Sequence, residues 1–387
     1  MAVENDDRRS AIDPRRAAHR RPGLDLLRAL AIVLVAVYHA GLFGFVLPFR
    51  IQRFGWIGVD LFFVLSGYLI AGQLFVALAR GRPLDIPRFY WRRALRILPA
   101  YFVIVAIYFL LPPLVREYPT MPALWKFLTF TQNLGLRGGT AFSHAWSLCI
   151  EFQFYLVLPF VILLLARRQV SIFAFFAVLI WCVAIRALLA HVNASASQPS
   201  FGWWQQWIYY PTYSRLDALT VGVSLAAMES FRPAWWSRLT RSAVWLWLPG
   251  LAAIVLALIL AEDGLSIVSS ALGFFLVAFG MGTFLICAVS PHLPFSRVAI
   301  PGAAFLATVA YSVYLSHKLA IHWIDNLSAV YPISAVPTYL LLLMSILLIG
   351  SALFFAVERP FLKVRQTYVK PESGREPSSL PGERLSI

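Results

Sequence analysis

The chain has 387 residues, of which 60% are apolar and 13% are charged, and its formal net charge is +15. Soluble globular domains are about half apolar and about a quarter charged, so this composition excludes an ordinary soluble protein and indicates a membrane protein. The basic residues stand between apolar segments instead of along one stripe. That pattern argues against nucleic-acid binding and is typical of membrane loops.

Ten apolar segments are long enough to cross a bilayer, because a spanning helix needs about 20 mostly apolar residues. They are 26–48, 57–79, 96–113, 145–166, 170–191, 208–229, 243–261, 266–289, 302–325 and 335–357. Residues 124–134 are apolar but too short to span, and we expect an interfacial or re-entrant piece there. The predicted fold is all-α, a polytopic integral membrane bundle of about ten transmembrane helices that forms one domain over residues 23–365.

The distribution of Lys and Arg predicts the orientation of the bundle. With the N-terminus inside, the cytoplasmic segments hold 24 of these residues and the external loops hold 5, as the positive-inside rule requires. Both termini are therefore predicted to be cytoplasmic. The polar tails 1–22 and 366–387 are predicted to be disordered. The charged start of the chain does not resemble a cleavable signal peptide, so we expect the first apolar segment to be retained.

The first apolar segment carries Arg28 and His39, eleven residues apart. In a helix they differ by only about 20° around the axis and lie about 16 Å apart along it. An ionisable group inside a span costs about 2.5–3.5 kcal/mol or more unless it is paired or faces water. We predict that Arg28 holds donor phosphates near the cytoplasmic surface while His39 meets a thioester. A snorkelling anchor and a hydrogen-bonded core histidine remain as structural alternatives.

Further ionisable residues are expected in the outer half of the bundle. Glu151 is predicted to lie about 9 Å below the external surface, near the level of His39, where a carboxylate could orient the histidine. A structural ion pair is the alternative for Glu151. Three other segments add polar groups to the same half-layer, which indicates a polar cavity. These groups are Asp60, Arg215, Asp217, Ser312 and His317.

Two aromatic stretches, the first of them also basic, border predicted spans. In the cytoplasmic connection 88–96, Arg93 and Arg96 fall on one face if the segment is helical, and guanidinium groups suit phosphate oxygens. Ordinary positive-inside charge is the alternative. The external stretch 203–210 is rich in Trp and Tyr, for which an aromatic belt is favoured over a sugar-stacking platform.

Seven stretches, taken in order along residues 22–365, resemble the bacterial acyltransferase 3 family. They are Arg28 with His39; 58–70; 90–99; Trp146-Ser147-Leu148 through Glu151; Arg215-Leu216-Asp217-Ala218; Tyr311-Ser312 with His317; and Glu358-Arg359-Pro360. The resemblance implies a multi-pass enzyme of the bacterial cytoplasmic membrane. It would transfer an acyl group, usually acetyl, from cytoplasmic acyl-CoA to a hydroxyl of a glycan, lipid-linked or small-molecule acceptor.

The resemblance also implies roles for individual residues. His39 and Glu151 would be catalytic, whereas Arg28, Arg93 and Arg96 would bind the donor. The residues expected to line the cavity or contact the acceptor are Asp60, Ser66, Arg215, Asp217, Tyr311, Ser312 and His317. Neither a metal nor a nucleic-acid partner is expected, and the membrane lipids are the remaining partners.

Two features depart from the family pattern. Phe152 stands where many members carry a second acidic residue, which argues against a mechanism with paired carboxylates. No extracellular hydrolase-like domain follows the last predicted span, so we expect the acceptor to bind in the membrane domain. The alternative function is a transporter or flippase for an anionic or saccharide ligand, in which the same buried charges form a permeation path.

Overall fold

The computed structural model describes residues 21–168, 173–331 and 334–367. Residues 1–20 and 368–387, which make up most of the two predicted tails, lie outside these ranges. Within them the chain forms helices and turns and contains no strand. The all-α prediction is confirmed.

The helices follow one another along the chain as a single series. The main ones are α1 Pro22–Leu42, α2 Ile57–Ala79, α3 Ile86–Leu110, α6 Trp146–Arg168, α7 Phe173–Ala194, α9 Asp217–Phe231, α10 Pro233–Arg241, α11 Ala243–Leu260, α12 Ile267–Val289, α13 Ala303–Val330, α14 Ala335–Leu353 and α15 Arg359–Thr367. Short helices are α4 Pro112–Val115, α5 Leu124–Leu128 and α8 Phe201–Trp204. Nine helices of the described chain are long and apolar enough to cross a membrane, so the chain is a polytopic membrane bundle.

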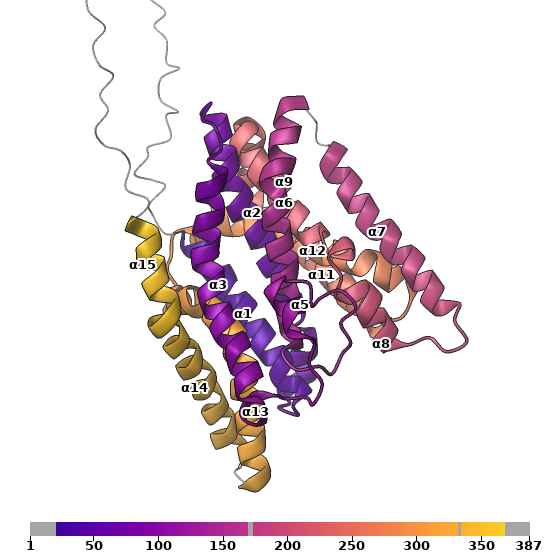
Figure 1. Ribbon diagram of the computed structural model, residues 1–387. Coiled ribbons are helices and arrows are strands. Elements are labelled where there is room, and N and C mark those ends of the chain that lie inside the picture. The colour runs from indigo at the N-terminus through magenta and orange to yellow at the C-terminus, as the bar shows by residue number, and fades with distance from the viewer. Residues whose placement is uncertain (1–20, 169–172, 332–333, 368–387) are drawn as a thin grey trace, which may run out of the picture.

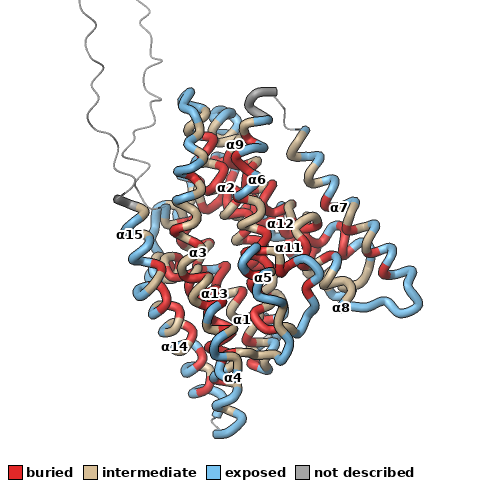
Figure 2. The backbone as a smooth tube through the Cα atoms, in the orientation of Figure 1, coloured by how far each residue is buried: buried red, intermediate tan, exposed pale blue. Residues whose placement is uncertain are grey.

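The bundle has a buried centre and an apolar outer surface. In α13, 72% of the most apolar window is buried, against 17% in α7, so α13 is central and α7 peripheral. Figure 1 shows α3, α14 and α15 on one side of the molecule and α7 and α8 on the other. Buried positions gather at the centre in Figure 2. Exposed apolar side chains such as Phe173 and Ile180 suit contact with lipid.

Helices α2 and α9 approach each other closely because both present glycine at the contact. A Cβ atom added to Gly67 would overlap the carbonyl oxygen of Leu219, and one added to Gly222 would overlap the carbonyl oxygen of Val64. Small residues that let two backbones meet are typical of helix contacts in membranes. The pairing of α2 with α9 therefore depends on these two positions.

Two segments differ from the predicted spans. The arginine-rich connection is the helical start of α3, where the Asp85 side chain accepts a hydrogen bond from the Arg88 N–H and so caps the helix. The sixth predicted span, 208–229, is α-helical only from Asp217, where the 15-residue helix α9 begins. A 3₁₀ turn, Thr212–Ser214, follows Pro211 and precedes α9. Proline cannot donate to a helix ladder, which explains the break.

Candidate active site between two cavities

Two cavities lie along α1. The larger, of about 410 Å³, is called the histidine cavity, and its lining includes His39, His144, Lys318, Trp56, Trp204 and Tyr209. The smaller, of about 290 Å³, is called the arginine cavity, and its lining includes Arg28, Arg92, Arg93, Arg96, Arg365 and Glu151. Arg28 and His39 thus face different cavities, at successive levels of one helix. Val59 and Tyr314 line both cavities.

His39 is held by a second histidine. The Nδ1 atom of His317 lies 2.8 Å from the Tyr314 carbonyl oxygen and 3.2 Å from that of Val313. Carbonyl oxygens only accept hydrogen bonds, so in a neutral His317 ring Nδ1 carries the proton and Nε2 accepts. That Nε2 lies 3.1 Å from Nδ1 of His39, which also lies 2.9 Å from the Val35 carbonyl oxygen. This hydrogen-bond network assigns a proton to Nδ1 of His39 and leaves its Nε2 as the basic nitrogen.

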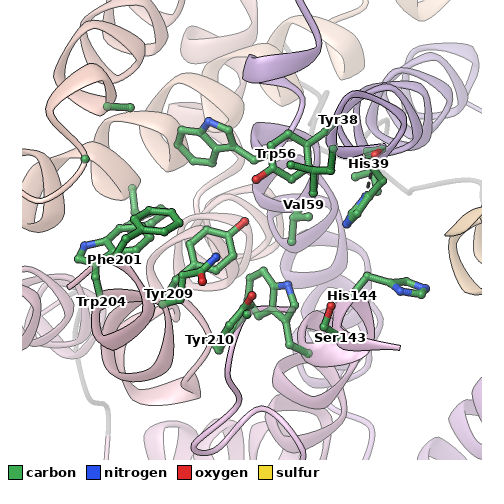
Figure 3. A pocket seen from close by; sticks show the side chains of 18 of the residues that line it. Tyr38, His39, Trp56, Val59, Ser143, His144, Phe201, Trp204, Tyr209 and Tyr210 are labelled. Carbon is green, nitrogen blue, oxygen red and sulfur yellow. Dashed lines mark hydrogen bonds between the residues drawn. The ribbon is translucent and has the colours of Figure 1, made fainter. Parts of the chain in front are cut away.

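A third histidine completes the cluster. The His144 ring lies with its centroid 5.9 Å from that of His39 and 4.9 Å from that of His317. Figure 3 shows His39 and His144 on one side of the cavity, opposite Trp204 and Tyr209. Among the described residues, no three or more His, Cys, Asp or Glu side chains are placed to hold a metal ion. The cluster is thus organised by hydrogen bonds and ring contacts.

A buried ion pair lies beside the histidines. The ammonium of Lys318 is 2.6 Å from Oε1 of Glu117, and the two side chains are 3% and 0% exposed. Glu117 also accepts a hydrogen bond of 3.0 Å from the Phe142 N–H. Its neighbour Tyr118 lines the histidine cavity, and burial, together with the charge of Glu117, raises the pKa of this phenol. The loop that follows α4 is therefore fastened to α13 at the cavity wall.

Tyr314 forms part of the partition between the cavities. Its hydroxyl donates a hydrogen bond of 2.7 Å to the His144 carbonyl oxygen. A phenol has one proton, so the contact with Ser147 Oγ is one in which the serine donates. Both hydroxyl groups are buried. Tyr314 is thus fixed between the histidine cluster and Ser147, which lines the arginine cavity.

The arginine cavity combines several guanidinium groups with one carboxylate. Among the described residues that line it, Glu151 is the only carboxylate, and it accepts hydrogen bonds from Ser66 Oγ at 2.8 Å and Tyr155 Oη at 3.0 Å. Arg93 donates to Gln73 Oε1 at 3.0 Å. The Nε atoms of Arg92 and Arg93 are buried without a hydrogen-bond partner. Buried donors without partners are costly, so this cavity favours an anionic ligand.

The predicted pairing of Glu151 with His39 differs from the structure. Glu151 is bonded to Ser66 and Tyr155 and lines the arginine cavity, whereas His39 contacts His317 and lines the histidine cavity. The rise per residue gives the depth of a residue in the membrane only for an ideal, untilted helix. It takes account neither of the tilt of α6 nor of the direction in which the side chain points. The catalytic role of Glu151 therefore stays a prediction.

The residues expected to line one polar cavity divide into three groups. Ser66 and Tyr311 line the arginine cavity, and His317 supports His39. Ser312 is instead bonded to Glu358 at 2.7 Å. Asp60 pairs with Arg215 at 2.8 Å, and Asp217 pairs with Arg186 at 2.9 Å. None of these four residues, Asp60, Arg215, Asp217 and Ser312, lines the arginine cavity or the histidine cavity. Their ion pairs and hydrogen bonds leave Oδ2 of Asp60 and both Nε and Nη1 of Arg215 without a hydrogen-bond partner in the described chain. Their expected role in contacting the acceptor therefore stays a prediction.

Arg215 supports the aromatic wall of the histidine cavity from behind. Its guanidinium carbon lies 3.7 Å from the ring centroid of Phe274, 4.9 Å from that of Tyr209 and 5.3 Å from that of Trp146. All three rings line the histidine cavity. A cation over aromatic faces is attracted to them, so Arg215 fixes the position of rings that can stack on a ligand.

The aromatic stretch 203–210 serves two purposes. Trp204, Tyr209 and Tyr210 line the histidine cavity, whereas Trp207 is 41% exposed and does not. The sugar-stacking alternative thus fits the first three rings, and an interfacial position fits Trp207.

Several site residues have no role in the sequence-based hypothesis. They are Arg92, Glu117, His144, Lys318 and Arg365. His144 lies two residues before Trp146 of the Trp-Ser-Leu stretch, and Lys318 directly follows His317, so both border stretches that carry the family resemblance. Glu117 lies in a loop, where no periodicity indicates what its side chain contacts.

Comparisons with known proteins agree with the resemblance. A family model described as an acyltransferase domain matches residues 21–356. The chain is 26% identical to O-acetyltransferase OatA of Staphylococcus aureus (strain NCTC 8325 / PS 47) over 327 residues, which cover 79% of this chain and 51% of that protein. It thus spans about half the length of this relative.

Two further relatives match shorter stretches. One is the putative peptidoglycan O-acetyltransferase YrhL of Bacillus subtilis (strain 168), 29% identical over 53% of this chain and 33% of that protein. The other is peptidoglycan O-acetyltransferase OatA of Listeria monocytogenes serovar 1/2a (strain ATCC BAA-679 / EGD-e), 35% identical over 36% of this chain and 23% of that protein. No solved structure matches the chain. Since the family model covers most of the chain, the protein belongs to the acyltransferase 3 family.

Proposed function

We propose that this protein is a membrane O-acetyltransferase that moves an acetyl group from acetyl-CoA in the arginine cavity to a glycan hydroxyl in the histidine cavity. The observation that carries the proposal is the meeting of the two cavities at Val59 and Tyr314. On one side of this point stands a histidine with a basic nitrogen, and on the other stand arginines with unpartnered donors.

The donor fits the arginine cavity by charge and by length. A guanidinium group binds phosphate oxygens in a forked geometry. The diphosphate of a CoA thioester has several such oxygens, so several arginines bind it more tightly than a single arginine would. Arg28 and His39 lie eleven residues apart on α1, or about 16 Å along its axis. A pantetheine arm is extended enough to carry the thioester from the arginines toward His39. Glu151 offsets part of the positive charge and fixes Ser66 and Tyr155 on the cavity wall.

At the transfer centre His39 acts as a general base. Its Nε2 takes the proton of the acceptor hydroxyl as the hydroxyl oxygen bonds to the thioester carbonyl carbon. The carbon–sulfur bond then breaks, and the proton passes from Nε2 to the leaving sulfur, so the products are an acetyl ester and a free thiol. His317 accepts the hydrogen bond from Nδ1–H of His39 throughout. Lys318 lines the same cavity as His39, and in the proposed mechanism its ammonium, which also pairs with Glu117, helps to stabilise the oxygen that becomes negative.

A glycan fits the histidine cavity by its lining. Trp204, Tyr209 and Phe274 present aromatic faces opposite the histidines, and such faces pack against the apolar faces of sugar rings. The relatives from Bacillus and Listeria are named for peptidoglycan. Peptidoglycan fragments are therefore the first acceptors to test. We place the arginine cavity on the cytoplasmic side of a bacterial inner membrane, because most Lys and Arg residues belong to the segments predicted to lie there.

The second candidate is a transporter for an anionic or saccharide ligand. Two cavities separated by a narrow partition are also what alternating access requires. The two candidates differ in chemistry, since a transporter moves the acceptor without acetylating it.

The test is acetyl transfer by the purified full-length protein in lipid nanodiscs, with radiolabelled acetyl-CoA and soluble peptidoglycan fragments. We expect labelled acceptor from the wild type and a rate at least about 100-fold lower from His39→Ala. His322→Ala is the matched control, because His322 lies on α13 but lines neither cavity. A wild-type rate from His39→Ala would contradict the mechanism, and movement of acceptor without labelling would favour the transporter.

A further inference from the structure

Helix α15, the last helix of the described chain, contributes Arg365 to the lining of the arginine cavity. The family resemblance implies no role for this residue. The π-turn Phe354–Glu358 joins α14 to α15. Figure 1 shows α15 beside α3, at the end of the bundle where α1 begins. From this position Arg365 reaches the lining of the arginine cavity.

Glu358 fastens this helix to the arginine-bearing start of α3. The Glu358 carboxylate is 1% exposed, accepts a hydrogen bond of 2.7 Å from Ser312 and lies 3.9 Å from Arg96. Leu362 lies one helical turn further on and packs against the apolar core. Arg365 follows three residues later, which places it on the same face of the helix. The two contacts at Glu358 and Leu362 therefore fix the direction in which Arg365 points.

The arginine cavity holds more positive charge than its own residues offset. Five arginines line it, and the only lining carboxylate within the described chain is Glu151. Arg92 and Arg96 repel the charge of Arg365, while Glu358 attracts it. Placing half-buried positive charges close together is unfavourable unless a bound anion neutralises them. A ligand with more than one separate phosphate group would relieve this repulsion at several points.

Arg365 occupies a different place from the other arginines. Arg93 and Arg96 belong to α3, a bilayer-spanning helix, and their positive charges attract the Glu151 carboxylate. Arg365 stands in the last turn of α15, two turns beyond Glu358. A CoA thioester carries a diphosphate next to its pantetheine arm and a single phosphate on the ribose, farther from the thioester. If the arm is directed toward Tyr314, the diphosphate would meet the arginines of α3, and the ribose phosphate would lie nearer to α15.

We propose that Arg365 binds the 3′-phosphate of the CoA donor and that α15 thereby completes the donor site. The inference rests on the proposed function, because it takes acetyl-CoA as the donor. It assigns recognition of one phosphate to one residue and makes Glu358 a positioning residue for Arg96 and for α15.

The test compares acetyl-CoA with acetyl-dephospho-CoA, which lacks only the 3′-phosphate. For the purified full chain, Arg365→Ala should raise the KM for acetyl-CoA about tenfold, the effect of one charge-assisted contact, and leave kcat unchanged. The KM for acetyl-dephospho-CoA should stay the same. Arg359→Ala is the matched control, since Arg359 belongs to the same helix, lies over the Phe355 ring and does not line the cavity. An equal rise in KM for both donors, or no rise for either, would overturn the assignment.

Calorimetric titration with CoA and dephospho-CoA separates this inference from the proposed function. The wild type should bind CoA about tenfold more tightly than dephospho-CoA, and Arg365→Ala should remove the difference. Equal affinities in the wild type overturn the inference even where acetyl transfer is observed. A preference for CoA that depends on Arg365, without any acetyl transfer, supports the phosphate contact while the proposed enzymatic function fails.

Discussion

At the scale of single residues, the proposed chemistry depends on the contact between His39 and His317. The 3.1 Å hydrogen bond fixes which nitrogen of His39 is basic. In hydrolase triads a carboxylate has this role. Here the partner is a neutral histidine, His317. When His39 takes up a proton, its ring becomes positively charged, and its Nδ1–H still donates to Nε2 of His317.

Substituting His317 tests this assignment. In His317→Gln the amide oxygen can still accept from Nδ1–H of His39, whereas in His317→Leu nothing can. We expect kcat to fall about 100-fold or more in the leucine variant, with partial recovery in the glutamine variant and little change in the KM for acetyl-CoA. The measurement is steady-state acetyl transfer in nanodiscs. Equal losses in both variants would show that His317 only fills space.

The sequence predicts this site in part. The spacing of Arg28 and His39 placed both on one face of a helix, and the structure has them lining successive cavities of α1. It could not pair His39 with His317, because 278 positions separate them and their contact depends on how α1 packs against α13. Glu151 was expected at the level of His39, but it lines the other cavity. The rise per residue, from which its depth was estimated, carries no information on helix tilt. Arg215 was expected on a cavity wall, although its buried partner Asp60 holds it behind the aromatic rings.

At the scale of elements, the contact of α2 with α9 brings the broken segment before α9 into the site. Arg186 of α7 donates hydrogen bonds to the carbonyl oxygens of Ser214, Ser270 and Ala271, at 2.6, 3.0 and 3.0 Å. The bond to Ser214 satisfies a carbonyl of the turn before α9, and the other two bonds join the same guanidinium to the start of α12. Apolar periodicity cannot reveal such a break, because the residues around it are as hydrophobic as the rest of a span.

Glycine substitutions on α2 test this contact. Gly67→Ala would force a methyl group into the Leu219 carbonyl oxygen, and we expect a loss of about 1–3 kcal/mol or more in the free energy of unfolding. Gly72→Ala, on the same helix, meets no atom closer than 3.9 Å and should leave stability unchanged or slightly higher. Thermal unfolding in detergent compares the two. A midpoint for Gly67→Ala equal to that for Gly72→Ala would exclude close backbone contact between these helices.

The loop fastened by Glu117 offers a second test at this scale. Glu117→Gln leaves the buried ammonium of Lys318 without its counter-charge, at a cost of about 3–5 kcal/mol. The double variant with Lys318→Met removes both charges and should recover most of the lost stability. The exposed pair Arg53–Glu262 is the control, and Glu262→Gln should change the unfolding midpoint little. Additive losses in the double variant would show that the two side chains do not interact.

At the scale of the whole molecule, the arginines and histidines occupy two cavities that meet at Tyr314 inside one helical bundle. We propose that the arginine cavity opens to the cytoplasm and the histidine cavity to the external side, because Lys and Arg are in excess in alternate connections. Acetyl-CoA would then never leave the cell, and the acceptor would never enter it. The partition at Tyr314 and Ser147 is where the acetyl group would pass.

The most direct test of this account is acetyl transfer across sealed membrane vesicles of known orientation. Inside-out vesicles would receive radiolabelled acetyl-CoA outside and carry peptidoglycan fragments in the lumen. The account predicts labelled fragments inside these vesicles, and none in right-side-out vesicles given the same two substrates, because acetyl-CoA would then face the histidine cavity. Equal labelling in both orientations, or labelling only when donor and acceptor share one side, would contradict it.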